Sequence, residues 1–312
     1  MEGFQEKFQS HNKTLIVIAG PTAVGKTELA IQLAKHYNTA IISADSRQFF
    51  REMAIGTAKP TDAELAQAKH YFINSHAITD NFNVGDFEVE GLKVIDDVFT
   101  EHNNTGILAG GSGLYIKAIC EGFDDVPSAD MEIRNRLNAE YVSNGITPLA
   151  ERLKITDPVY YAQVDTSNPQ RIIRALEVIE NTGQPFSSYR TANAKQRSFN
   201  IIKIGLNLSR EVLYQRINLR VDLMIEQGLV AEVKSLLPYR DYNALNTVGY
   251  KEIFDYLDGT TDLDTAIALI KQNTRRFAKR QLTWFNKDKN FAWFEPSQLD
   301  GIIDAIDKIL QL

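Results

Sequence analysis

The segment Gly20-Pro-Thr-Ala-Val-Gly25-Lys26-Thr27 constrains the fold more than any other, because it matches the phosphate-binding pattern G-x-x-x-x-G-K-[ST]. The apolar, β-branched run Thr14–Ala19 before it predicts a buried strand, and Thr27–Tyr37 after it has the spacing of a helix. A loop in this position turns backbone N–H groups towards a phosphate. We therefore expect it to bind a diphosphate or triphosphate, with Lys26 on the terminal phosphate and Thr27 on Mg²⁺. The expected binding residues are Gly20, Pro21, Thr22, Ala23, Val24, Gly25, Lys26 and Thr27.

Three further apolar runs, Thr39–Ser43, Gly106–Ala109 and Asn200–Leu206, predict strands that alternate with helices. This pattern indicates an α/β fold with a doubly wound parallel sheet of the P-loop type. The segment between the last two strands reads helical throughout, which predicts an all-helical insertion at 122–198. The remaining residues, 1–121 and 199–312, then form the core, and its C-terminal part is also helical.

The clearest helix of the insertion runs from Asn168 to Thr182. Asn168 suits the N-cap, Pro169 the first turn and Gly183 the position after the end.

The composition narrows the possible partners and compartments. The net charge of −6 argues by itself against a nucleic-acid partner, but Lys271–Lys289 holds seven basic residues and one acid, enough for a local electrostatic footprint. The single cysteine, Cys120, excludes an internal disulfide. We expect no signal peptide, no membrane-spanning helix, a cytoplasmic location and no obligate protein partner.

The ends of the predicted strands distinguish this chain from ordinary P-loop hydrolases. Those enzymes hold Mg²⁺ with an aspartate that ends a neighbouring strand, whereas the third predicted strand here ends in Gly110-Gly111. The second strand is followed by Asp45 instead. Ligands bind beyond the carboxyl ends of strands, so we expect Asp45 near the P-loop, as a base or a metal ligand. The alternative is that Asp45 caps the next helix.

An ordered set of motifs resembles the tRNA dimethylallyltransferases. The motifs are GPTAVGKT, SADSRQ, Ile55–Pro60, Gly110–Tyr115, Asp125–Asp130 with Arg134, Asn168–Leu176, Val248–Lys251 and Arg276–Phe285. The resemblance implies a P-loop core with a helical insertion. It also implies transfer of a dimethylallyl group from dimethylallyl diphosphate to N6 of the adenine next to the anticodon (tRNA position 37), with Mg²⁺ assisting the release of diphosphate.

The resemblance assigns roles to particular residues. It makes Asp45 the general base and places Arg220 on the diphosphate, where the alternative is a solvated helix arginine. Ser112, also expected to be catalytic, stands where the family has threonine and keeps the hydroxyl. The implied contacts with the tRNA anticodon stem-loop are Asp45, Ser46, Arg47, Gln48, Ser112, Arg134, Gln170, Arg171, Ile172, Ile173, Arg174, Gly249, Tyr250, Lys251, Arg276, Lys279, Arg280 and Gln281.

The predicted helix over 271–285 carries two pairs of cations four residues apart, Arg275 with Lys279 and Arg276 with Arg280. This spacing gives it a cationic face, and we expect Phe277 and Trp284 to pack inward on another face. A solvated helix face is the alternative.

Three other functions compete with the prenyltransferase. A nucleoside or nucleotide kinase also has a P-loop, but it leaves the Asp45 segment, the GGSGLY turn and the C-terminal helix unexplained. A prenyltransferase acting on free adenine nucleotides does not need the insertion or the basic helix. A P-loop scaffold that binds RNA does not need Lys26, Thr27, Asp45 and Arg220 together.

Overall fold

The computed structural model describes residues 12–127, 130–190 and 194–311. The N-terminal residues 1–11, for which we expected no signal peptide, and residues 128–129 of the Asp125–Asp130 motif lie outside this range. The described residues form two compact units: residues 12–120 with 197–311, and residues within Glu121–Gln196. The predicted insertion was 122–198.

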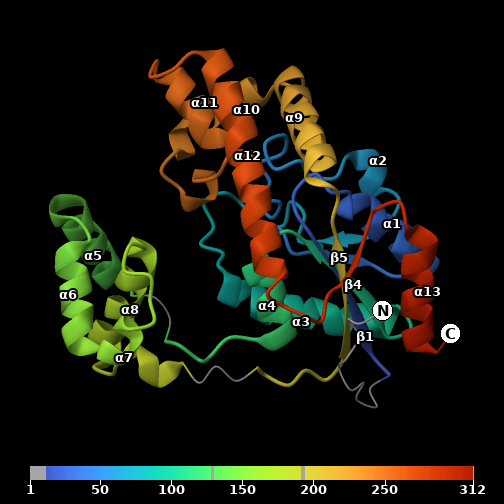
Figure 1. Cartoon of the computed structure of the whole chain (residues 1–312), viewed down its shortest axis with the longest axis horizontal. Helices are drawn as coiled ribbons and strands as arrows, with labels where there is room; N and C mark the ends of the chain where they lie inside the picture. The colour runs from blue at the N-terminus through green and yellow to red at the C-terminus, as the bar shows by residue number, and fades with distance from the viewer. Residues whose placement is uncertain (1–11, 128–129, 191–193, 312) are drawn as a thin grey trace. The chain divides into compact units, whose positions relative to one another are not determined.

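The first unit is built on a parallel sheet of six strands in the order β3-β2-β4-β1-β5-β6 (Figure 1). The strands are β1 (Thr14–Ala19), β2 (Ile41–Ser43), β3 (His70–Tyr71), β4 (Thr105–Gly110), β5 (Asn200–Leu206) and β6 (Ala292–Phe294). The predicted parallel α/β fold is confirmed. The edge strands β3 and β6 were not predicted, because two or three residues are too few to show a period.

Alternate residues of β1 supply two hydrophobic cores, one on each face of the sheet. Leu15 and Val17 pack with α3 (Val84–Glu101) and α4 (Gly113–Glu121). Ile16 and Ile18 pack with α1 (Lys26–His36) and α13 (Leu299–Leu310). Helices on both faces leave the carboxyl edge of the strands as the place where loops gather.

The helices that follow β5 form a third hydrophobic cluster, and Phe50 and Met53 from the segment after β2 join it. These helices are α9 (Arg210–Glu226), α10 (Leu229–Ser235), α11 (Tyr250–Leu257) and α12 (Leu263–Phe285), with the short turns η2 (Leu237–Tyr239) and η3 (Asn243–Leu245). The short helix α2 (Asp62–Leu65) lies elsewhere, between β2 and β3. The long helix α12 extends from this cluster down to α4 (Figure 1). Its residues Ala278 and Phe285 reach the cores on the two faces of the sheet.

The prediction that Phe277 and Trp284 pack inward is wrong. Phe277 is 39% exposed and Trp284 is 40% exposed. Their spacing of one heptad puts them on a common stripe of α12, but the side of α12 that meets the sheet carries Ala278 and Phe285 instead.

The second unit consists of helices, as expected. It contains α5 (Met131–Asn144), α6 (Thr147–Thr156), α7 (Pro158–Tyr161), α8 (Pro169–Thr182) and the turn η1 (Phe186–Tyr189). The predicted ends of α8 are confirmed: the Asn168 side chain accepts a hydrogen bond from the N–H of Arg171, and Gly183 is left-handed at φ 71. Leu137, Leu149 and Leu176 belong to a hydrophobic core within this unit.

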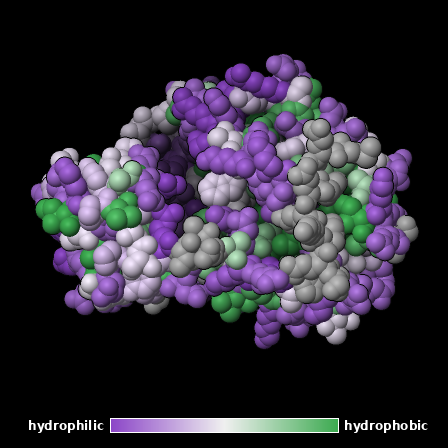
Figure 2. All heavy atoms as spheres, turned by 60° about the horizontal axis from the view of Figure 1, so that its bottom comes forward, coloured by the Kyte–Doolittle hydropathy of each residue, from purple (hydrophilic) through white to green (hydrophobic). Residues whose placement is uncertain are grey.

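Among the described residues, no helix has both the length and the apolar character needed to cross a membrane. The face drawn in Figure 2 is mostly hydrophilic, with hydrophobic residues in small separate patches.

Candidate active site

The P-loop forms an anion cradle between β1 and α1. Its backbone is left-handed at Ala23 (φ 64) and at Gly25 (φ 111), a conformation that glycine adopts without strain and that turns successive N–H groups towards one side. The helix α1 begins at Lys26, so the positive end of its dipole faces the same space. The Lys26 Nζ donates to the carbonyl oxygens of Gly20 (3.0 Å) and Pro21 (2.8 Å).

Two partly buried cations, Lys26 and Arg220, line this space. Burial lowers the pKa of Lys26 to about 8; the nearby Asp45 carboxylate raises it, and Arg220 lowers it further. Arg220 comes from α9, and its Nη1 donates to the Thr22 Oγ1 at 3.2 Å. Burial also lowers the pKa of Arg220, against the effect of Asp45. A bound anion therefore offsets the cost of keeping both cations out of water.

Asp45 lies in a turn directly after β2. Its Oδ1 accepts the backbone N–H of Arg47 at 3.0 Å, as aspartates often do in turns. The next α-helix, α2, has Thr61 as its N-cap, so Asp45 does not cap it.

Ser112 holds this turn to the end of β4. The Ser112 Oγ accepts the N–H of Ser46 at 3.0 Å and donates to the Ser46 Oγ at 3.2 Å. The serine hydroxyl thus makes local contacts that position the turn carrying Asp45.

Gln48, expected to contact tRNA, has its amide engaged by the protein. Its Nε2 donates to the carbonyl oxygens of Thr57 (3.3 Å) and Ala58 (3.1 Å), and its Oε1 accepts from the Ser43 Oγ at 3.3 Å. Gln48 therefore ties the 57–58 loop to the end of β2.

Glu232 on α10 is a functional candidate that sequence reasoning missed. Its carboxylate accepts three consecutive backbone N–H groups, those of Ala54 (3.1 Å), Ile55 (2.7 Å) and Gly56 (3.0 Å). It also accepts the Tyr250 hydroxyl at 2.6 Å. A single glutamate in a helix carries no signal of such a role, because the three backbone N–H groups that it accepts lie 176 to 178 residues away in the chain.

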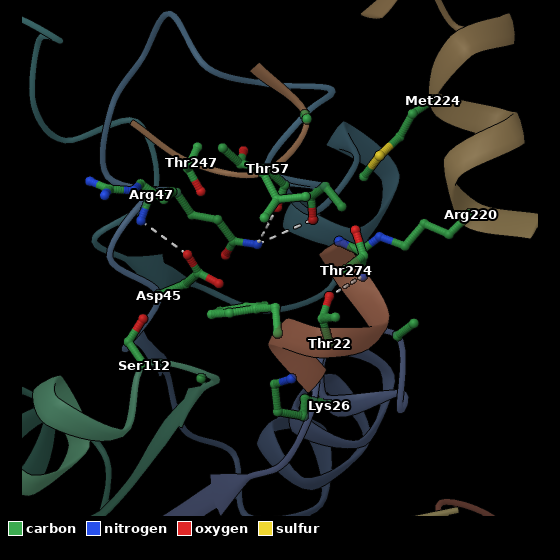
Figure 3. A pocket seen from close by; sticks show the side chains of 18 of the residues that line it. Thr22, Lys26, Asp45, Arg47, Thr57, Ser112, Arg220, Met224, Thr247 and Thr274 are labelled. Atoms are coloured by element: carbon green, nitrogen blue, oxygen red, sulfur yellow. Dashed lines mark hydrogen bonds between the residues drawn. The ribbon is translucent and has the colours of Figure 1, made fainter. Parts of the chain in front are cut away.

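These segments enclose a cavity of about 950 Å³, into which the side chains of Lys26, Asp45 and Arg220 point (Figure 3). The predicted residues that line it are Thr22, Ala23, Gly25, Lys26, Thr27, Asp45, Ser46, Arg47, Gln48, Ser112, Arg220, Gly249, Lys251, Arg280 and Gln281. Gly20, Pro21, Val24 and Tyr250 are buried behind this lining.

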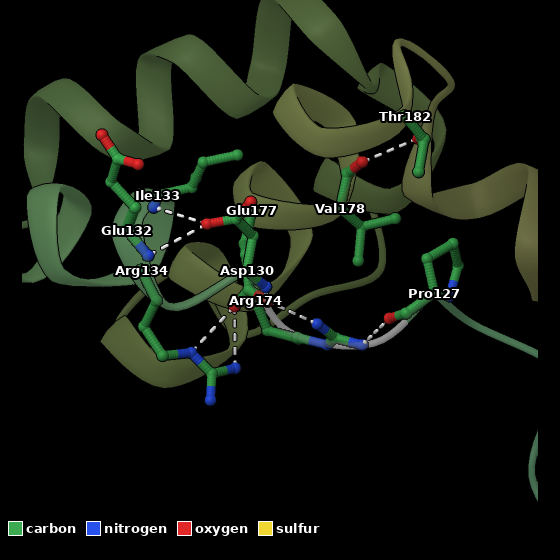
Figure 4. Close-up of polar contacts among 9 residues, drawn as sticks. All are labelled: Pro127, Asp130, Glu132, Ile133, Arg134, Arg174, Glu177, Val178 and Thr182. Carbon is green, nitrogen blue, oxygen red and sulfur yellow. Dashed lines mark hydrogen bonds and ion pairs between the residues drawn. The ribbon is translucent and has the colours of Figure 1, made fainter.

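Two of the predicted residues of the second unit, Arg134 and Arg174, contact Glu177, which is fully buried (Figure 4). Its carboxylate accepts from the Arg134 Nε (2.8 Å), the Arg174 Nη1 (2.7 Å) and the backbone N–H of Asp130 (3.1 Å). Arg134 and Arg174 are thus fixed by an acid, whereas Gln170 and Arg171 are exposed.

Ile172 and Ile173 do not fit the expectation of a tRNA contact. They are 0% and 2% exposed and belong to the core of the second unit. Their side chains stabilise this unit and are not available to a ligand.

The parallel sheet and the anion cradle define a P-loop protein. The family model described as "IPP transferase" matches residues 48–288. The chain is 55% identical to a tRNA dimethylallyltransferase of Christiangramia forsetii, over 90% of this chain and 93% of that one, and 49% identical to one of Cytophaga hutchinsonii, over 96% and 98%.

Solved structures give the same result. The tRNA isopentenylpyrophosphate transferase of Bacillus halodurans matches with a TM-score of 0.70 and 39% identity, over 96% of this chain and 97% of that one. A eukaryotic dimethylallyltransferase crystallised acting on tRNA matches with a TM-score of 0.79 and 26% identity, over 95% and 79%. This chain belongs to the IPP transferase family, as the ordered motifs predicted.

The lowered pKa of Lys26 predicts a pH dependence of anion binding. Between about pH 8 and pH 10 the free protein loses the charge on Lys26, so its affinity for inorganic diphosphate should fall relative to that of the Lys26→Arg variant, which stays charged. Titrations of both proteins with diphosphate at several pH values measure the ratio of the two affinities. The protonation of diphosphate itself affects both affinities equally and cancels in this ratio. A ratio that stays constant from pH 7 to pH 10 would contradict the burial of Lys26.

Proposed function

We propose that this protein transfers the dimethylallyl group of dimethylallyl diphosphate to N6 of the adenine next to the anticodon of tRNA, at position 37, in the cytoplasm. The observation that carries the proposal is the cavity in which Asp45 lies with two partly buried cations, Lys26 and Arg220. The family membership and the names of its relatives support the substrates.

The chemistry follows from these side chains. The adenine N6 attacks the allylic carbon, an N–C bond forms, the C–O bond to the diphosphate breaks, and the N6 proton passes to the Asp45 carboxylate. The amine is a poor nucleophile because its lone pair is delocalised, so a positioned base lowers the barrier. Lys26, Arg220 and the P-loop N–H groups stabilise the charge that develops on the diphosphate.

The cavity residues fit Mg²⁺ as a cofactor. Within residues 12–127, 130–190 and 194–311, no group of three or more His, Cys, Asp or Glu side chains is arranged to hold a metal. Mg²⁺, however, binds through substrate phosphates and water with only one or two protein oxygens, and the Thr27 hydroxyl and the Asp45 carboxylate line the cavity. When bound, Mg²⁺ would neutralise charge on the leaving diphosphate.

We propose tRNA contacts on each of the two units, taken separately. On α12, Arg276, Lys279 and Arg280 are exposed, whereas the Arg275 Nη1 donates to Asn218 on α9 at 2.7 Å and is turned away. On α8, Gln170 and Arg171 are exposed. These groups suit the phosphates of an anticodon stem-loop.

Incubation of the protein with labelled dimethylallyl diphosphate, Mg²⁺ and bulk tRNA, without ATP, should transfer label to tRNA. Transfer of the γ-phosphate of ATP to a nucleoside, with tRNA left unlabelled, would instead establish the kinase. Labelling of free adenine nucleotides but not of tRNA would establish the smaller substrate.

The Asp45→Asn variant should keep its tRNA affinity and lose about two to four orders of magnitude in turnover, the usual contribution of a positioned base. Single-turnover rates with saturating substrates measure this loss. Asp264→Asn, an exposed aspartate at the start of α12, is the matched control. A near-normal rate in Asp45→Asn would remove Asp45 from the mechanism.

Replacing Arg276 and Arg280 by alanine should weaken tRNA binding and flatten its salt dependence by roughly one unit of slope per lost phosphate contact. The control replaces Lys93 and Lys308, which are exposed on α3 and α13 and do not line the cavity. Titrations at several salt concentrations compare the two pairs. Equal affinities and slopes would show that this face of α12 is only solvated.

A further inference from the structure

Gln281 on α12 connects two loops of the active site. Its Oε1 accepts the backbone N–H of Thr22 in the P-loop at 2.9 Å. Its Nε2 donates to the carbonyl oxygen of Gly111, directly after β4, at 2.8 Å. Gln281 is 7% exposed; its hydrogen bond to Gly111 is buried and the one to Thr22 is partly buried.

The contact at Gly111 leaves room for a side chain at that position only if the Gln281 amide moves away. A Cβ atom on Gly111 would lie 2.4 Å from the Gln281 Nε2, which is closer than such atoms approach in proteins. The amide of Gln281 therefore fills the space between the P-loop and the end of β4.

Thr22 links the Gln281 amide to Arg220, one of the two cations that we propose to bind the diphosphate. Its backbone N–H is held by Gln281, and its Oγ1 accepts from the Arg220 Nη1 at 3.2 Å. A displaced Thr22 would change the geometry of the cradle and the position of Arg220 together.

We propose that Gln281 is a positioning residue for the prenyl diphosphate, acting through Thr22 and Arg220, and that it is not a contact for tRNA. This inference rests on the proposed function. The oxygen and the nitrogen of its amide are both hydrogen-bonded to backbone groups of the first unit. The exposed cations next to it on α12, Lys279 and Arg280, carry the tRNA contact instead.

The Gln281→Met variant tests this role, because methionine keeps the length of the side chain and removes both hydrogen bonds. Leaving the Thr22 N–H and the Gly111 carbonyl without partners should raise the KM for dimethylallyl diphosphate about 10-fold to 100-fold. The Kd for tRNA should stay within about twofold of the wild type, because both hydrogen bonds of the Gln281 amide are made within the protein. Gln272→Met, at an exposed glutamine of the same helix, should change neither value.

Gly111→Ala breaks the same connection from the other side, because the added Cβ displaces the Gln281 amide. It should also raise the KM for dimethylallyl diphosphate. In the double variant with Gln281→Met the two effects should not add, since both remove one interaction.

A weaker tRNA affinity with an unchanged KM for dimethylallyl diphosphate would overturn the proposal and make Gln281 a tRNA contact. A smaller active fraction with both constants unchanged would overturn it in favour of a role in folding alone. Binding of inorganic diphosphate to the same variants separates this inference from the proposed function, because that measurement does not depend on prenyl transfer. If the wild type binds inorganic diphosphate but prenylates nothing, a Gln281→Met variant with weaker binding still supports the inference, and unchanged binding refutes it.

Discussion

The partial burial of two cations, Lys26 and Arg220, at the carboxyl edge of the sheet is the constraint on which the site depends. Desolvation lowers the pKa of Lys26 to about 8, the neighbouring Arg220 acts in the same direction, and Asp45 opposes both. A dense anion such as a diphosphate removes this cost, so the free energy of binding comes from relieving an unfavourable arrangement. In the proposed function, the same charges stabilise the diphosphate as it leaves, which is what an allylic transfer requires.

Uncharged and acidic side chains from distant parts of the chain keep the loops around these cations in place. Ser112 holds the turn of Asp45, Gln281 joins the P-loop to the end of β4, and Glu232 gathers three backbone N–H groups of the 54–56 loop. Each is a hydrogen bond between an ordered side chain and a loop backbone. Loops that would otherwise sample several conformations are thereby fixed before the substrates arrive.

Local sequence patterns predicted the central strands, the P-loop and the ends of one helix. The apolar runs of β1, β4 and β5, the ends of α8 and the P-loop could be located in the sequence because each depends on neighbours within one turn or one strand. The role of Gln281 could not, because its partner Thr22 is 259 residues away, and the nearest partner of Glu232 in the 54–56 loop is 176 residues away. The placement of Phe277 was wrong for a related reason: a helical period shows that residues share a stripe but not which stripe meets the sheet.

A crystal structure with tRNA and a non-reactive thio analogue of dimethylallyl diphosphate tests the central claim most directly. We expect the diphosphate against the P-loop, in contact with Lys26 and Arg220, and the allylic carbon facing an adenine N6 that is hydrogen-bonded to Asp45. A diphosphate bound away from the P-loop, or an adenine whose N6 points away from Asp45, would contradict the account.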